Sequence, residues 1–92
     1  MPGTEREEAE RAIDRALLDQ WDPLGVRETP GPHDEYRRFV PGIYSLLARG
    51  GSDVQVTRLL HQLERDELGH PELAARDLTP LVRTLREIER SI

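Results

Sequence analysis

The densest group of side chains able to bind a metal or transfer protons is His61, Glu64, Glu67 and His70, spaced at intervals of three. Glu67 and His70 match the E-x-x-H half-motif of di-iron helical bundles. That chemistry requires a second half-motif and further glutamates on facing helices, and the sequence has no second E-x-x-H. A glycine before His70 and a proline after it place this histidine beyond the helix end. We therefore predict a solvated helix face and no metal site.

Two acidic pairs, Asp34-Glu35 and Asp66-Glu67, could provide acid–base chemistry if burial or proximity separated their pKa values. Adjacent residues on a helix point in different directions, and Asp34 stands where an N-cap is expected. Capping and solubility are therefore the predicted roles. His33 could act as a base, but no serine of the chain lies in a nucleophile-elbow context. No catalytic residue and no cofactor is predicted.

Glycine and arginine residues could instead bind anions. The Gly50-Gly51-Ser52 run precedes a helix, yet a phosphate-binding P-loop needs a lysine, and the chain has none. Helix termination followed by a new cap explains the run. Arg83, Arg86 and Arg90 alternate with glutamates in the last helix, without nearby aromatic residues for base stacking. They are predicted to form a salt-bridged exposed face.

Composition narrows the class of protein. A chain of 92 residues corresponds to one domain, here residues 1–92. The absence of cysteine excludes disulfides and thiol chemistry. A net charge of −5 disfavours binding to nucleic acid or anionic membranes and favours a basic partner. No apolar run is long enough to cross a membrane, and the acidic N-terminus is unlike a signal peptide. A cytoplasmic protein is expected.

The apolar residues recur at helical spacing in four segments, and no segment alternates like a strand. The first predicted helix runs over Glu5–Gln20 and begins with a capping box of Thr4 and Glu7. Residues 1–4 are expected to be disordered. The helix should end at Asp22-Pro23-Leu24-Gly25, whose residue types favour a type I turn.

The second predicted helix begins after an N-cap at Asp34 and ends at Gly50-Gly51. Pro41 interrupts its apolar stripe, because a proline removes one backbone hydrogen bond and clashes with the preceding turn. The interruption predicts either a kink or one short turn followed by a new start at Pro41.

Ser52 and Gln55 form a second capping box at the start of the third predicted helix, which ends at Gly69. Residues 72–77 could add one helical turn. Thr79 as a cap, followed by a proline at the first helical position, is expected to begin the fourth helix.

These elements predict an all-α fold, a compact bundle of four main helices with short loops and a fifth short helical turn as an option. Trp21 continues the apolar stripe of the first helix and is assigned to the core, although an exposed anchor in an interface is the alternative. The predicted core consists of Ile13, Leu17, Trp21, Phe39, Val40, Ile43, Leu47, Val56, Leu59, Leu60, Leu63, Leu81, Leu85 and Ile88.

Three short motifs resemble a family of small bacterial all-helical domains of unknown function. They are the W-D-P-L-G-V turn that starts at Trp21, the D-E-Y helix start at Asp34, and the V-P-G-I-x-x-L-L run that starts at Val40. The likeness leaves the N-terminal segment and the last helix uncovered. It implies a compact helical fold and no mechanism, because the family has no assigned activity.

The leading hypothesis is a non-enzymatic protein-interaction module, such as a toxin-neutralising or regulatory partner of another protein. The candidate surface comprises Asp34, Glu35, Tyr36, Tyr44, Asp66 and Glu67. One alternative is a small-ligand binder or enzyme with a site at His33–Tyr36. The other is a structural homodimer. The expected partner is another protein, for which a basic one is favoured by the net charge, or a second copy of this chain.

Overall fold

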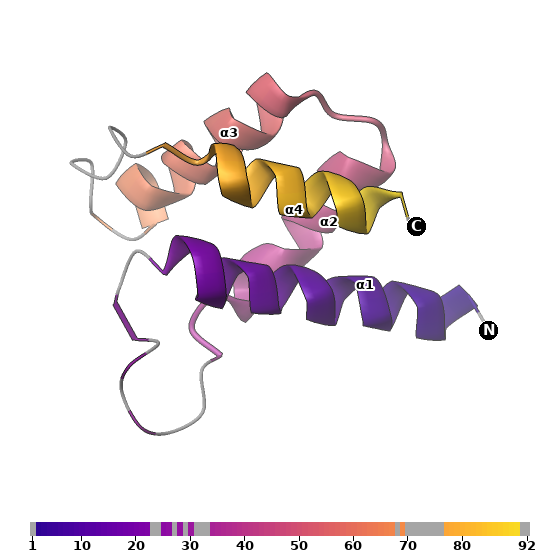
Figure 1. Ribbon diagram of the computed structural model, residues 1–92, viewed down its shortest axis with the longest axis horizontal. Coiled ribbons are helices and arrows are strands. Elements are labelled where there is room, and N and C mark those ends of the chain that lie inside the picture. The colour runs from indigo at the N-terminus through magenta and orange to yellow at the C-terminus, as the bar shows by residue number, and fades with distance from the viewer. Residues whose placement is uncertain are drawn as a thin grey trace.

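Four α-helices make up most of the described chain in the computed structural model (Figure 1). The structure describes residues 2–22, 25, 26, 28, 30, 34–67, 69 and 77–90. The helices are α1 (Pro2–Ala16), α2 (Val40–Ala48), α3 (Asp53–Gln62) and α4 (Thr79–Glu89). No strand occurs in these ranges, so the predicted all-α class is confirmed.

Three short helical turns adjoin these helices. A π-helical turn, η1 (Leu17–Trp21), continues α1, and a second, η3 (Leu63–Glu67), continues α3. A single 3-10 turn, η2 (Arg37–Phe39), precedes α2. α1 and α4 lie side by side and run in opposite directions, whereas α2 packs against α1, α3 and α4 (Figure 1). α2 is therefore the central element of the packing.

α1 begins three residues earlier than predicted. It starts at Pro2, so residues 2–4 are helical rather than disordered, and Thr4 lies inside the helix instead of capping it. Proline is well tolerated in the first turn of a helix, where its missing N–H would have no intrahelical partner. Glu5 lies in this first turn, where the helix dipole favours an acidic side chain.

The core lies where all four helices meet, and most of its predicted members are buried there. The buried hydrophobic residues of the described chain are Ala9, Ile13, Ala16, Leu17, Trp21, Tyr36, Phe39, Val40, Ile43, Leu46, Leu47, Val56, Leu60, Leu78, Leu81, Val82 and Leu85. Leu59, Leu63 and Ile88 are only partly buried and pack at the margin of this core. The predicted core omitted Ala9, Ala16, Tyr36, Leu46, Leu78 and Val82.

The second helix begins later than predicted. α2 starts at Val40 with Pro41 in its first turn, and only η2 precedes it, so the option of a short turn followed by a new start is confirmed. Asp34 does not cap this segment with its side chain. Instead its carbonyl oxygen accepts the N–H of Arg37 (3.2 Å), and Tyr36 occupies the N-cap position without a side-chain cap.

The connection between α2 and α3 forms as the sequence predicts. Gly50 adopts a left-handed conformation (φ +79°), and its N–H donates to the carbonyl oxygen of Leu47 (3.1 Å). The N–H of Gly51 donates to the carbonyl oxygen of Leu46 (2.9 Å), which completes a Schellman motif. Ser52 and its partner three residues later then form the predicted capping box.

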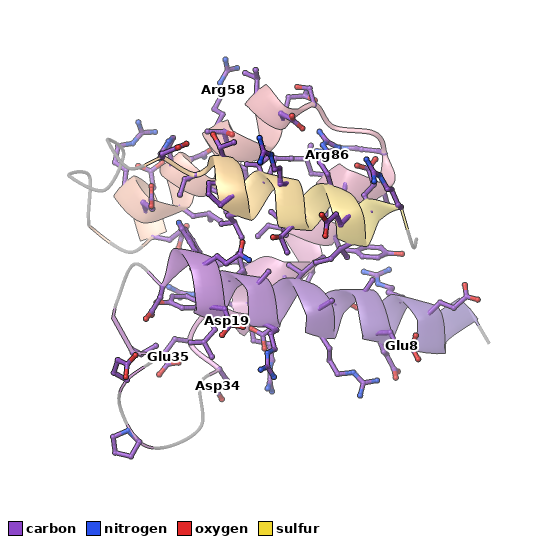
Figure 2. All side chains as sticks on the ribbon, viewed as in Figure 1. Glu8, Asp19, Asp34, Glu35, Arg58 and Arg86 are labelled. Carbon is purple, nitrogen blue, oxygen red and sulfur yellow. The ribbon has the colours of Figure 1, made fainter. Side chains whose placement is uncertain are left out.

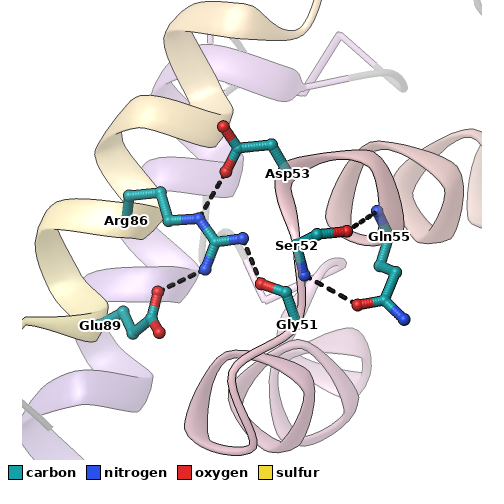
Figure 3. Close-up of polar contacts among 6 residues, drawn as sticks. All are labelled: Gly51, Ser52, Asp53, Gln55, Arg86 and Glu89. Atoms are coloured by element: carbon teal, nitrogen blue, oxygen red, sulfur yellow. Dashed lines mark hydrogen bonds and ion pairs between the residues drawn. The ribbon is translucent and has the colours of Figure 1, made fainter.

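Arg86 links α4 to the connection between α2 and α3 through hydrogen bonds (Figure 3). Its guanidinium donates to the carboxylate of Asp53 (2.5 Å), to the carbonyl oxygen of Gly51 and to the carboxylate of Glu89. The hydrogen bonds to Asp53 and Glu89 raise the pKa of Arg86. The predicted salt-bridged face is thus correct for Arg86, although this side chain is mostly covered instead of exposed.

The fourth helix starts one residue earlier than predicted. Thr79 is its first residue, and the N-cap position belongs to Leu78, which has no capping side chain. Asp77 supplies the acceptor instead: its Oδ1 accepts both the N–H (3.0 Å) and the hydroxyl (2.6 Å) of Thr79. These hydrogen bonds lower the pKa of Asp77. The optional turn at residues 72–77 lies outside the described residues, except for Asp77.

Candidate functional site

A carboxylate is buried between the two π-helical turns. Glu64 of η3 has an exposed fraction of 0%. Its Oε2 accepts the indole N–H of Trp21, at the end of η1, at 2.9 Å. Its Oε1 lies 2.7 Å from Nδ1 of His61, whose side chain is 26% exposed. A buried charged or polar side chain requires such partners, so this group links the end of α1 to the end of α3.

The position of Glu64 corrects the prediction of a solvated helix face. His61 is partly buried and Glu67 is exposed, while His70 lies outside the described residues. The sequence did contain a signal, because a Trp assigned to the core needs an acceptor for its indole N–H. It did not say which of many carboxylates would supply that acceptor.

The turn after Trp21 is held by a second carboxylate. The N–H of Gly25 donates to the carbonyl oxygen of Asp22 (3.0 Å), which closes the predicted turn, although Pro23 and Leu24 lie outside the described residues. Oδ1 of Asp22 accepts the N–H of Val26 (2.9 Å) and the hydroxyl of Tyr36 (2.7 Å). The ring of Tyr36 packs against Trp21, with centroids 5.5 Å apart.

These buried polar groups are arranged to stabilise the packing. Each oxygen of Glu64 is within hydrogen-bond distance of another side chain of the protein. Neither oxygen can therefore contact a substrate unless the core repacks. Within the described ranges, no group of three or more His, Cys, Asp or Glu side chains is placed to hold a metal ion.

A groove lined by charged side chains lies between α1 and the start of α2. This groove has a volume of about 410 Å³. Its lining consists of Glu7, Glu10, Arg11, Asp14, Arg37, Val40 and Pro41. The four residues from α1 follow at intervals of three, one and three, the spacing that places side chains on one face of a helix. We call this feature the acidic groove.

Two arginines, one in the acidic groove and one beside it, form hydrogen bonds with groove residues. Nε of Arg11 donates to the carbonyl oxygen of Glu7 at 3.4 Å, and Arg6, just outside the groove, pairs with Glu10 at 3.2 Å. Burial raises the pKa of Asp14, and the nearby charge of Asp34 raises it further, while Arg37 acts in the opposite direction. The carboxylate of Asp14 is therefore less well solvated than a free one, which favours a cationic ligand.

Asp14→Asn should slightly stabilise the protein at neutral pH. The folded-state pKa of Asp14 is raised, so folding favours the protonated carboxyl over the ionised one. The stability contributed by the protonated carboxyl is fully present below the unfolded-state pKa and is lost as the pH rises through the folded-state pKa. The Asn side chain stays neutral and does not lose it. Urea unfolding at several pH values measures this difference between variant and wild type. It should shrink toward zero in acid, and an Asn variant that is less stable at pH 7 would contradict the assignment.

The candidate surface predicted from the D-E-Y motif is only partly accessible. Asp34 is exposed, whereas Glu35 is half-buried and its Oε2 is buried without a hydrogen-bond partner in the described chain. Tyr36 is 1% exposed, so it is a core residue and the prediction that it lies on an accessible surface is wrong. Its hydroxyl donates to the carboxylate of Asp22. His33 lies outside the described residues.

The other predicted surface residues belong to separate elements. Tyr44 of α2 is half-buried, and the guanidinium of Arg6 lies 4.7 Å from its ring centroid. Asp66 and Glu67 are exposed on η3, where Asp66 pairs with Arg65 at 3.0 Å. Within the described ranges, no ion pair joins these residues to Asp34, so they do not form one site with it.

Comparisons with known proteins give no further identification. No protein-family model, no curated protein and no solved structure matches the chain. The resemblance in the three short motifs therefore stays a prediction. Among the described residues, no helix is both long and apolar enough to cross a membrane.

Proposed function

We propose that the protein is a non-enzymatic interaction module of the cytoplasm that binds a basic segment of another protein. The observation that carries this proposal is the acidic groove, in which Glu7, Glu10 and Asp14 converge beside the apolar side chains of Val40 and Pro41. The combination of carboxylates with an apolar edge suits a segment that carries both arginine or lysine and an apolar residue.

The charge distribution supports a basic partner. The net charge of the chain is −5, so a basic segment is attracted from a distance as well as on contact. Asp34 adds a further negative charge close to Asp14, as its effect on the pKa of Asp14 indicates. Arg11 and Arg37 reduce the negative charge of the groove. They could also select among basic partners, because a carboxylate of the partner could pair with either arginine.

The buried polar groups support a non-enzymatic role. The side chains with most potential for chemistry, Glu64 and Asp22, are bonded to core residues and hold the helices together. In the alternative ligand site at His33–Tyr36, Tyr36 is a buried core residue, and neither Asp34 nor Glu35 lines the acidic groove. The homodimer is a separate proposal, and the molar mass in solution tests it.

The binding of a basic peptide tests the proposed function. The probe is a fluorescently labelled synthetic peptide of Arg, Leu and Ala, titrated with the full-length protein at low and at physiological salt. Glu7→Gln combined with Glu10→Gln should weaken binding about tenfold, because two charge pairs at the contact are lost. The affinity of the wild type should fall as salt rises, since exposed charges are screened.

A charge-matched variant provides the control. Glu67→Gln combined with Glu87→Gln removes the same charge from two exposed positions on η3 and α4. This variant should bind within about twofold of the wild type, because only long-range attraction is changed. An equal loss in both double variants, or wild-type binding that does not depend on salt, would exclude the acidic groove as the binding site.

A further inference from the structure

We propose that a second surface, of opposite charge, binds an acidic segment of a partner protein that also carries apolar side chains. This surface is a groove of about 390 Å³ between α2 and α3. Arg49 lies at the end of α2, and Arg58 and Gln62 lie one turn apart on α3. Leu46 and Leu59 form its apolar floor. We call it the basic groove.

The basic groove is lined by two arginines. The groove lining contains no acidic residue, and within the described ranges no ion pair joins Arg49 or Arg58 to another side chain. The nearest acidic residue along α3, Asp53, is already paired with Arg86. Both guanidiniums are exposed and line the same groove on a chain of net charge −5. Guanidinium groups favour bidentate binding of carboxylates.

An exposed apolar side chain beside Arg58 favours a partner segment that also carries apolar residues. Val54 is 63% exposed and is the large hydrophobic residue most open to solvent in the described chain. It lies one turn before Arg58 on the same face of α3, and both line a neighbouring shallow hollow together with Asp53 and Thr57. Figure 2 shows Arg58 projecting from α3 on the side away from α1. Apolar contacts at Val54 and Leu59 thus flank the guanidinium that would bind a carboxylate.

This surface is distinct from the acidic groove. α2 contributes Val40 and Pro41 to the acidic groove but Gly42 and Leu46 to the basic one. The two proposals therefore do not depend on each other, and variants of one surface leave the residues of the other unchanged.

The test uses the full-length protein and two labelled synthetic peptides, one of Glu, Leu and Ala and one in which Ser replaces Leu. Fluorescence anisotropy should show tighter binding of the first peptide. Arg49→Gln combined with Arg58→Gln should weaken that binding about tenfold, because two charge-assisted contacts are lost. Arg15→Gln combined with Arg90→Gln removes the same charge from exposed sites on α1 and after α4, and it should stay within about twofold.

Circular dichroism establishes that both double variants keep the helical fold. Equal losses of affinity in the two variants would mean that net charge alone governs binding and would overturn the proposal. Equal affinity of the wild type for the two peptides would also overturn it, because the apolar residues of the groove would then have no part in recognition. The absence of binding to either peptide would overturn it as well.

Discussion

Glu64→Ala should lower the free energy of unfolding by about 3 kcal/mol. Glu64 is fully buried, and its removal leaves the indole N–H of Trp21 in the core without this acceptor. The substitution also creates a cavity between η1 and η3. A domain of this size has a total stability on the order of 5–15 kcal/mol, so the loss should be visible as a large shift of the urea midpoint.

Glu67→Ala is the matched control for this prediction. It removes the same side chain from an exposed position in the same helical turn, and a surface substitution changes stability by less than about 0.5 kcal/mol. A double-mutant cycle with Trp21→Phe isolates the hydrogen bond itself, for which we expect a coupling of about 1.5–3 kcal/mol. Equal midpoints for Glu64→Ala and Glu67→Ala would show that the buried carboxylate has no structural role.

Gly51→Ala should destabilise the protein by about 2 kcal/mol. A Cβ atom at this position would lie 2.5 Å from Cδ1 and 2.9 Å from the carbonyl oxygen of Leu46. The side chain of Leu46 belongs to the core, and its carbonyl oxygen accepts the N–H of Gly51, so neither can move aside without loss. The same backbone carries the carbonyl oxygen that Arg86 binds (Figure 3). Thermal unfolding followed by circular dichroism measures the effect.

Gly42→Ala should have the opposite effect. Gly42 lies inside α2, and a Cβ atom there would meet nothing within 4 Å. Alanine is favoured over glycine in a helix interior by roughly 0.5–1 kcal/mol, so this variant should be more stable than the wild type. The two alanine variants should therefore shift the melting temperature in opposite directions. A shift in the same direction would contradict the assignment of close packing at Gly51.

The elements that local chemistry determines could be predicted from the sequence. The capping box at Ser52 and the glycine pair before it depend on neighbours within a few residues, and the structure confirms both. The turn after Trp21 also depends on neighbouring residues, and the hydrogen bond from Gly25 to Asp22 confirms that a turn forms there. Local chemistry failed at Thr79, where Asp77 competes successfully as the acceptor of the first helical N–H.

The candidate site was harder to predict, because it depends on contacts between residues far apart in the chain. Trp21 and Glu64 are separated by 43 positions, and the spacing of the acidic residues did not identify which of them is buried. Tyr36 was assigned to the candidate surface, yet it is buried and its hydroxyl donates to Asp22, 14 positions earlier. The acidic groove joins α1 to Arg37 and Val40, a pairing that helical periodicity within α1 does not reveal.

The most direct test of the account is a map of amide chemical shifts in the labelled full-length protein during titration with the Arg–Leu–Ala peptide. The account predicts that the largest shift changes fall on Glu7, Glu10, Asp14, Arg37 and Val40, around the acidic groove. Changes of similar size over all acidic segments, including η3 and α4, or changes centred on Asp66 and Glu67, would contradict it.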